Sequence, residues 1–256
     1  MTAFPLVRRA GAAVLCLALA GLHAACSPAG PPEPAPLALR TADGVAVAGT
    51  LHAPDPRAAK GHPPGLLLVH GFGGDRGVWE GFAEAAAVRG YLCAAVDLRG
   101  HGDTRGPDRD AVERGPAGWR AALADLAAAR EALVAAGADP ETLAVAGEEF
   151  GASLALLYAL AEPAVHAVVG VSPVLEMRGL DAERAVRDLK DCPALFVAAE
   201  NDGLGAAAAR ALKAAAPVFC EARLYRGTAS GADLFAAHPQ AMGEVFTWLE
   251  DVLRAD

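Results

Sequence analysis

Lysine is nearly absent from this chain of 256 residues, which has only Lys60, Lys190 and Lys213. Aromatic residues make up just 5% of the sequence, and the formal net charge is −9. A protein that binds nucleic acid or an anionic membrane surface through charge normally presents a basic patch. The composition therefore predicts neither a nucleic-acid ligand nor an electrostatic membrane contact.

Long apolar runs are confined to the N-terminus. Hydrophobic residues reach 54% of the chain, but many are alanine, and no later run has the roughly 20 residues that a spanning helix needs. The first run, residues 10–22, follows Arg8 and Arg9 and precedes small residues, a pattern typical of an export signal. We assign residues 1–25 to a signal peptide.

The five cysteines are too few for a disulfide framework, but Cys26 has an informative context. The sequence LHAAC at residues 22–26 resembles a bacterial lipoprotein signal, although His23 stands where a large apolar residue is usual. Residues 26–36 are rich in proline and predict an extended tether. We expect an exported, periplasmic protein attached to a membrane only through lipid on Cys26; cleavage to a soluble periplasmic protein is the alternative.

The remainder, residues 37–256, has the pattern of one α/β domain. Residues 37–53 alternate apolar and polar side chains around Asp43-Gly44, which predicts an antiparallel hairpin. Apolar segments of strand length then alternate with helical stretches, the clearest being residues 119–136 with Trp119, Leu123, Leu126 and Leu133 on one face. This alternation predicts a mostly parallel sheet with flanking helices. The predicted strands are residues 65–69, 91–96, 142–146, 165–171, 194–199 and 218–225.

Two segments carry a family resemblance: LLLVHGFGG at residues 66–74 and YLCAAVDLRGHG at residues 91–102. They are similar to the opening of an α/β-hydrolase domain of the dienelactone hydrolase and esterase kind, and the similarity continues to about residue 253. The resemblance implies the α/β-hydrolase fold, without a large lid because residues 172–191 leave room for only one helix. His70 and His101 lie in turns of these motifs, where we expect hydrogen-bonded structural histidines rather than a catalytic base.

The resemblance also locates three catalytic positions, two of which are changed. The nucleophile elbow of the family, Gly-x-nucleophile-x-Gly, reads GEEFG at residues 147–151 and places Glu149 at the nucleophile. Asp202 retains the position of the acid, and Ser230 stands where the histidine is expected. Because triad residues act as a unit, this pattern favours a non-catalytic binding or scaffolding protein.

By the same resemblance, the backbone N–H groups of Phe72 and Phe150 form an oxyanion hole. Glu149 then lies at a helix N-terminus beside two donors that favour a negative group. We predict that its carboxylate fills this hole. The helix end and the hydrogen bonds should lower its pKa unless burial outweighs them.

An enzymatic alternative stays open, namely a carboxylic-ester or lactone hydrolase with a non-standard set of catalytic residues. Glu149 could act as a carboxylate nucleophile, but the following hydrolysis lacks a histidine base. We expect Ser153 to cap its own helix, and Ser172, which can face the pocket, has no histidine in sequence reach. His238, eight residues beyond the histidine position, is a poor substitute base. Glu149 and Asp202 could also form a carboxylate pair for glycoside hydrolysis or a metal, but their spacing supports neither.

The other cysteines suggest structure rather than catalysis. Cys93 lies within a predicted strand and is expected to be a small buried hydrophobe. Cys192 and Cys220 lie at the starts of two strands that the resemblance makes neighbours, so they could form a disulfide. No Cys or His pair has metal-ligand spacing, and we predict neither a metal nor a cofactor. The sequence leaves open whether the ligand is a small molecule or a protein.

Overall fold

The computed structural model describes residues 30–104, 115–217 and 219–253. The signal peptide and Cys26 lie outside these residues. The described chain begins with an antiparallel pair, β1 (Ala35–Arg40) and β2 (Ala46–His52), joined through a turn in which Gly44 has a φ of 87°. This is the predicted hairpin, with Gly44 in the left-handed conformation that glycine adopts without steric cost.

A single sheet of eight strands forms the centre of the molecule, in the order β1-β2-β4-β3-β5-β6-β9-β10. Strand β2 is antiparallel to β4, and all strands from β4 to β10 in this order run parallel. The fold prediction is therefore confirmed. The parallel strands are β3 (Gly65–Val69), β4 (Leu92–Val96), β5 (Leu143–Glu148), β6 (Val165–Val171), β9 (Ala194–Ala199) and β10 (Cys220–Tyr225).

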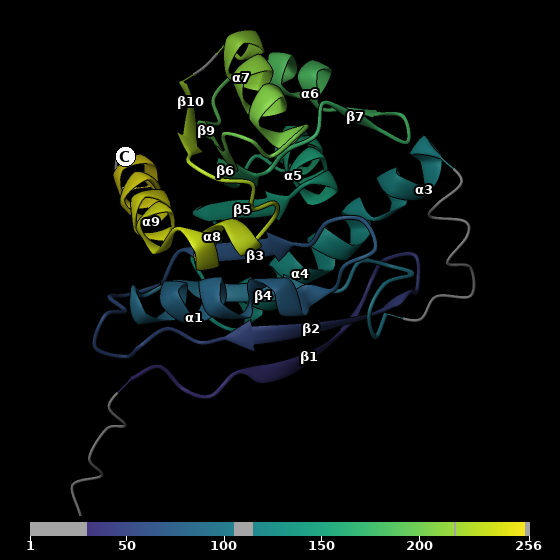
Figure 1. Ribbon diagram of the computed structural model, residues 1–256. Coiled ribbons are helices and arrows are strands. Elements are labelled where there is room, and N and C mark those ends of the chain that lie inside the picture. The colour runs from purple at the N-terminus through teal and green to yellow at the C-terminus, as the bar shows by residue number, and fades with distance from the viewer. Residues whose placement is uncertain (1–29, 105–114, 218, 254–256) are drawn as a thin grey trace, which may run out of the picture.

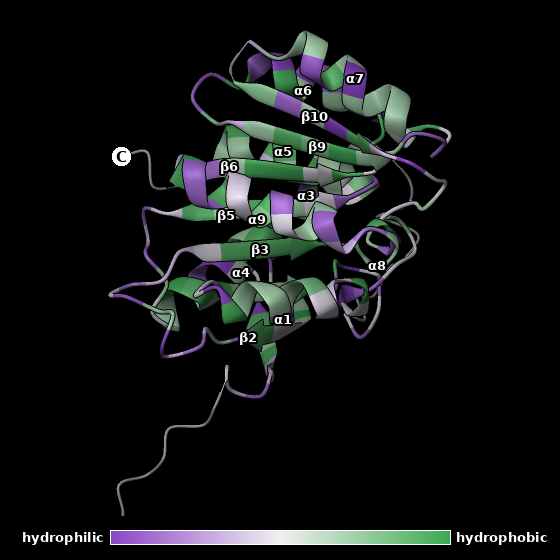
Figure 2. Ribbon diagram, turned by 60° about the vertical axis from the view of Figure 1, so that its left-hand side comes forward, coloured by the Kyte–Doolittle hydropathy of each residue, from purple (hydrophilic) through white to green (hydrophobic). Residues whose placement is uncertain are grey.

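Helices cover both faces of this sheet (Figure 1), so its central strands, β4, β3, β5, β6 and β9, are buried on both sides. In β3, Leu67 and Val69 join one apolar core, while Leu66 and Leu68 join the other. Figure 2 shows the central strands as mostly hydrophobic and the helices as mixed. The first core includes residues of α3 (Pro116–Ala121), α4 (Leu123–Ala135), α5 (Phe150–Ala161), α6 (Ala182–Asp188) and α7 (Gly205–Ala215). The second includes residues of η1 (Arg76–Trp79), α1 (Glu80–Val88), α8 (Asp233–Ala237) and α9 (Pro239–Leu253).

The single helix predicted over residues 119–136 is interrupted at Ala122, where α3 gives way to α4. Ala122 N–H donates to Trp119 O, and Asp125 N–H donates to Ala122 O. These bonds span three residues rather than four and tighten the chain locally. Trp119, Leu126 and Leu133 are buried as predicted, whereas Leu123 is only partly buried.

A buried ion network ties α4 to the loop after β4. The Arg99 guanidinium donates to the Asp125 carboxylate at 2.8 Å and to the Asp43 carboxylate in the hairpin turn at 2.7 Å. Arg99 N–H also donates to Asp125 Oδ2 at 2.8 Å. Asp125 is fully buried and Arg99 is 7% exposed, so each charge depends on the other for compensation.

The segment between β6 and β9 is short, as expected. It holds a two-stranded ribbon, β7 (Glu176–Met177) with β8 (Leu180–Asp181), followed by the seven residues of α6. The resemblance implied a domain without a large lid, and this segment contains none. Among the helices in the described part of the chain, none is both long and apolar enough to cross a membrane.

Cys192 and Cys220 are free thiols, so the disulfide considered from the sequence is absent from the structure. Cys220 lies opposite Ala194 in the register of β10 with β9, two residues beyond Cys192. Two residues along a strand and one strand spacing together separate Cα atoms by about 8 Å, beyond the roughly 7 Å that a disulfide spans. Cys93 is fully buried in β4, as predicted.

Candidate functional site

Glu149 stands between β5 and α5 in a strained backbone conformation, with φ 46° and ψ −112°. Glycine is required on both sides of Glu149, because backbone atoms approach these two positions too closely for a side chain. A Cβ on Gly147 would lie 2.2 Å from Gly151 O, and a Cβ on Gly151 would lie 2.3 Å from Val69 O. A non-glycine residue with positive φ at such a tight strand-to-helix turn is the geometry of a nucleophile elbow.

The neighbouring Glu148 joins two loops around this elbow. Its Oε1 accepts from Gly71 N–H at 3.1 Å, and its Oε2 accepts from Ala232 N–H at 2.7 Å. A Cβ on Gly231 would lie 2.5 Å from Glu148 Oε2, so glycine is needed there as well. Glu148 was not among the site residues predicted from the sequence. The signal was a second acid in GEEFG, at the end of a strand buried on both faces.

The Glu149 carboxylate does not contact the predicted donors. Within the described residues its one hydrogen bond comes from the Ser230 hydroxyl, at 3.5 Å from Oε1, rather than from the N–H groups of Phe72 and Phe150. Its Oε2 lies against the loop after β3, 3.0 Å from where a Cβ on Gly71 would be. The prediction that Glu149 occupies these donors was therefore wrong, because the side chain turns toward Ser230.

Burial outweighs the helix end in setting the charge of Glu149. Its pKa is raised, first by burial and then by the neighbouring Glu148 and Asp202 carboxylates, while the hydrogen bond from Ser230 acts in the opposite direction. The elbow thus carries an acid that is more readily protonated than an ordinary glutamate.

Asp202 follows β9 and lies beside Ser172. A Cβ on Gly205 would be 2.2 Å from Asp202 Oδ2 and 3.0 Å from Ser172 Cα. Asp202 is only 9% exposed, and its Oδ2 is buried without a hydrogen-bond partner in the described part of the protein. Such an atom is unusual because buried carboxylate oxygens normally accept hydrogen bonds.

His70 is a structural histidine, as predicted. Its Nε2 accepts from Leu98 N–H at 3.0 Å, so its Nδ1 carries the proton and donates to Gly71 O at 2.7 Å. Burial lowers the pKa of His70 to about 4, which keeps it neutral. His101 is also buried and packs against the rings of Phe72 and Trp119.

The alternative nucleophiles and base are engaged elsewhere. We expected the Ser153 hydroxyl to bond to its own helix, but it donates to Val174 O at 3.5 Å. Ser172 has a φ of 47°, and its hydroxyl accepts from Gly231 N–H at 2.9 Å. His238 packs against the Tyr225 ring and makes a hydrogen bond with Gln240, outside the lining of the elbow pocket. The structure therefore brings no serine and histidine together as a catalytic pair within the described residues.

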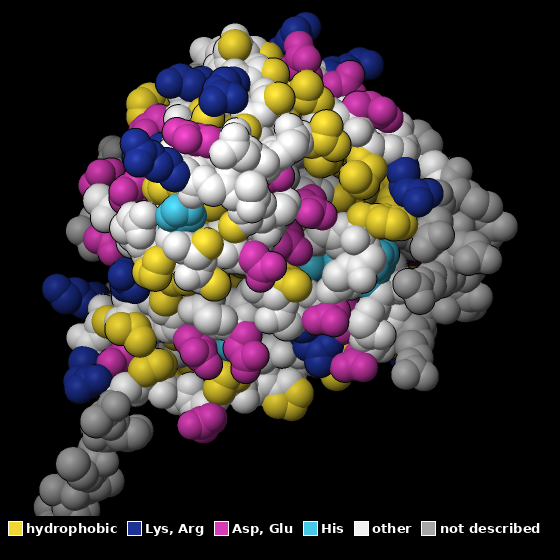
Figure 3. Space-filling view, in the orientation of Figure 1, with side chains coloured by type: hydrophobic (Ala, Val, Ile, Leu, Met, Phe, Trp, Pro, Cys, Tyr) yellow, Lys and Arg dark blue, Asp and Glu magenta, His cyan; other side chains and the backbone are white. Residues whose placement is uncertain are grey.

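A pocket of about 490 Å³ opens at the elbow. Its polar end is formed by Glu148, Glu149 and Ser230, and its described lining contains no lysine, arginine or histidine. Figure 3 shows acidic side chains gathered near the middle of this face of the molecule, with basic ones mostly toward its margins. No group of three or more His, Cys, Asp and Glu side chains in residues 30–104, 115–217 and 219–253 could hold a metal ion. The remaining lining residues are Val78, Gly81, Phe82, Gly231, Ala232, Asp233, Phe235, Ala236 and Met242.

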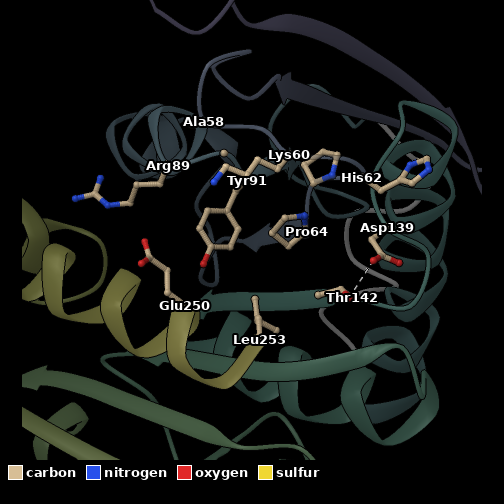
Figure 4. A pocket seen from close by; sticks show the side chains of 12 residues that line it. Ala58, Lys60, His62, Pro64, Arg89, Tyr91, Asp139, Thr142, Glu250 and Leu253 are labelled. Atoms are coloured by element: carbon tan, nitrogen blue, oxygen red, sulfur yellow. Dashed lines mark hydrogen bonds between the residues drawn. The ribbon is translucent and has the colours of Figure 1, made fainter. Parts of the chain in front are cut away.

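A second pocket, of about 370 Å³, lies at the opposite end of the strands, where β3, β4 and β5 begin (Figure 4). Lys60, His62 and Arg89 lie around it, together with Tyr91 and Glu250. None of the predicted site residues lines this pocket. We therefore distinguish the elbow pocket, at the carboxyl ends of the strands, from this basal pocket at their amino ends.

The sheet order, the elbow and the buried turn histidines define an α/β hydrolase. The profile of the family described as "Serine aminopeptidase, S33" matches residues 62–200, more than half of the chain. The chain therefore belongs to this family of the α/β-hydrolase fold. A comparison with functionally curated proteins found no match.

Solved structures agree on the fold. An α/β hydrolase from Penicillium is 15% identical with a TM-score of 0.73, covering 87% of this chain and 99% of its own. A protein assigned as a dienelactone hydrolase from Klebsiella pneumoniae is 20% identical with a TM-score of 0.69, covering 87% and 98%. An esterase from Rhodococcus is 18% identical with a TM-score of 0.67, covering 85% and 99%. At these identities the likeness concerns the fold.

Proposed function

We propose that this protein is a non-catalytic member of its family that binds a ligand in the elbow pocket. The observation that carries this proposal is Glu149 in the strained elbow conformation, hydrogen-bonded to Ser230 instead of to an imidazole. A nucleophile at this position needs an adjacent base to be activated and regenerated. Within the described lining of the pocket, no group with the chemistry of a histidine is available.

Attack by the Glu149 carboxylate itself would not complete a catalytic cycle. A covalent intermediate on this side chain needs water activated by a base, and Ser230 has no basic character. The buried turn histidine His70 is committed to Gly71 and Leu98 through both ring nitrogens. The described residues at the elbow can therefore hold a ligand but supply no base that would turn it over.

Two assays test this proposal. The purified protein should hydrolyse p-nitrophenyl acetate no faster than buffer does, and a serine-reactive fluorophosphonate probe should not label it. The competing function, an ester or lactone hydrolase, is the activity named for solved neighbours such as the Rhodococcus esterase. Turnover that persists through purification and disappears in Ser172→Ala or His238→Ala would establish that function instead.

Restoring the family pattern gives a sharper test. Glu149→Ser alone should gain little because the new hydroxyl lacks a base. Ser230→His alone should gain little because the elbow still carries a carboxylate, a much weaker nucleophile toward an ester than an activated hydroxyl. The double substitution supplies both beside Asp202, so its rate should exceed the product of the single effects. A folded double variant without turnover would show that the pocket differs from a hydrolase at further positions.

We further propose that the protein is exported and attached to a bacterial membrane by lipid on Cys26. The support is the sequence around Cys26 and the proline-rich stretch after it. Two or three acyl chains would be required, because one chain anchors only marginally. Mass spectrometry of the mature N-terminus tests this; an unmodified terminus after Ala24 or Ala25 would refute it.

A further inference from the structure

The two edge strands of the sheet differ in how their free edges are protected against pairing with another chain. Strand β1 contains Pro36, and proline cannot donate a backbone hydrogen bond to a further strand. Strand β10 has the sequence CEARLY, without proline or glycine, and among the described strands it pairs only with β9. Figure 2 shows β10 as the last strand at its end of the sheet. All six of its residues are partly exposed, so the described chain leaves this edge accessible.

The backbone groups of β10 point alternately toward β9 and toward the free edge. Phe219 O accepts from Ala194 N–H at 3.1 Å, and Tyr225 O accepts from Glu200 N–H at 2.6 Å. Because the direction alternates from one residue to the next along a strand, the odd-numbered residues of β10 face β9. The even-numbered residues therefore present their N–H and C=O groups to the free edge. These residues are Cys220, Ala222 and Leu224.

A second copy of this chain can pair with that edge about a two-fold axis. Antiparallel pairing of two identical strands places the same patch of each copy against the other. With the axis at Ala222, this residue lies opposite its own counterpart, and Cys220 lies opposite Leu224 of the second copy. Each of these pairs joins residues whose backbone groups face outward, as an antiparallel ladder requires.

The side chains of β10 complement one another in this register. Arg223 donates to Glu221 Oε2 at 2.7 Å within one copy, so both side chains lie on the same face of the sheet. With the axis at Ala222, Glu221 of each copy lies opposite Arg223 of the other, which gives two cross-strand pairs of opposite charge. An axis one pair further along in either direction gives no such pair.

The same register also accounts for an exposed aromatic ring. Phe219 is 59% exposed, and it directly precedes β10. With the axis at Ala222, Phe219 lies opposite Tyr225 of the second copy, on the face that carries Glu221 and Arg223. Aromatic side chains directly opposite one another on neighbouring strands stabilise a sheet. Pairing would therefore cover an apolar ring that one copy leaves in water.

We propose that this protein forms a two-fold dimer in which β10 pairs antiparallel with β10 of a second copy, so that the sheet continues across the interface. Ala222 lies on the axis, and the charge pairs between Glu221 and Arg223 fix the register. The proposal goes beyond ligand binding and does not depend on it, since no residue of β10 belongs to the described lining of the elbow pocket.

Sedimentation velocity over a series of protein concentrations tests the dimer. One detergent is kept throughout, so that lipid on Cys26 does not itself cause association. The wild type should sediment as a dimer that dissociates on dilution. Ala222→Pro removes an N–H group that faces the free edge and is not used within one copy, so it should weaken dimerisation at least about tenfold. Its circular dichroism spectrum should stay that of the wild type. A monomeric wild type at every concentration, or a folded Ala222→Pro variant that dimerises like the wild type, would overturn the proposal.

Mixing two charge variants tests the register. Glu221→Arg and Arg223→Glu each place like charges opposite one another and should each weaken self-association about tenfold. An equimolar mixture of the two variants places an arginine opposite a glutamate at both positions, so a heterodimer should form. A change in stability within one copy cannot produce this recovery. A mixture that associates no better than its components would overturn the proposed pairing.

A matched pair of apolar variants separates this interface from non-specific association. Phe219→Ser removes the aromatic pair and should weaken dimerisation about fivefold. Val88→Ser removes a side chain that is 52% exposed at the end of α1, a helix that packs against β2 and β4, and should leave dimerisation unchanged. Equal weakening by the two variants would show that association does not proceed through β10.

Discussion

Asp125 and Asp202 are both buried carboxylates near the carboxyl-terminal edge of one sheet, but their surroundings are opposite. Asp125 accepts from the Arg99 side chain and backbone, whereas Asp202 Oδ2 has no partner within the described residues. A buried charge without compensation costs stability. The fold carries this cost at the elbow, whereas at α4 the Arg99 bonds offset part of it, although burial still raises the pKa of Asp125. The contrast separates a region organised for stability from one that we propose is organised for binding.

The largest effect on stability should come from removing the Asp125 carboxylate, which pairs with Arg99. Asp125→Ala leaves Arg99 buried without its main partner and should lower the free energy of unfolding by about 3 to 5 kcal/mol. Urea denaturation followed by circular dichroism measures this. The matched control is Asp43→Ala, whose side chain is 49% exposed; its loss should be about 1 kcal/mol or less. Equal losses in the two variants would contradict the assigned role of Asp125.

Glu148 is the one acid at the elbow that behaves like Asp125, and its replacement should have the next largest effect. Glu148→Gln places an amide NH₂ group against either Gly71 N–H or Ala232 N–H, so one backbone donor loses its acceptor. We expect a loss of about 1 to 3 kcal/mol in the free energy of unfolding. Hydrogen exchange should also accelerate at Gly71 and Ala232. A variant as stable as the wild type would show that these bonds contribute little.

Glu149 should make stability depend on pH in a direction opposite to most carboxylates. Because its pKa is raised in the folded protein, the folded state binds more protons than the unfolded state between the two pKa values. The contribution of Glu149 is complete below its unfolded pKa, near 4.5, and is lost as pH rises through the higher folded pKa. Glu149→Gln should remove this fall in stability with rising pH, as measured by urea midpoints between pH 4 and 8. An unchanged pH profile would argue against a raised pKa.

The smallest effect is expected at Asp202. Asp202→Asn removes a charge whose Oδ2 has no partner among the described residues. The free energy of unfolding should therefore stay within about 1 kcal/mol of the wild type and should rise rather than fall. The same substitution at Asp125 should be clearly destabilising. A strong loss in Asp202→Asn would mean that this carboxylate is compensated in a way that erases the contrast with Asp125.

Most of the sheet could be predicted because its central strands are buried on both faces and appear as continuous apolar segments. Residues 65–69, 165–171 and 194–199 form strands with the predicted bounds. The break at Ala122 could not be predicted, and neither could the pairing of the buried Asp125 beyond it with Arg99, a residue from a distant loop. Apolar periodicity does not report on such a long-range ion pair.

The elbow was located from sequence, but its hydrogen bonds were not. The pattern GEEFG places Glu149 at the turn, and the structure gives that residue a φ of 46°. The direction of its carboxylate depends on Ser230, and the role of Glu148 depends on loops after β3 and β10 that meet only in the folded chain. Contacts among three separate segments leave no local pattern in the sequence.

The direction of β1 places the N-terminal end of the domain on the side opposite the elbow pocket. Strands β1 and β4 are both antiparallel to β2, so the chain enters the sheet from the edge opposite the elbow, and Figure 1 shows the first described residues leading away on that side. If Cys26 carries lipid, as we propose, the membrane would lie on the side of the domain opposite the elbow pocket. A ligand of this pocket would then arrive from solution rather than from the bilayer.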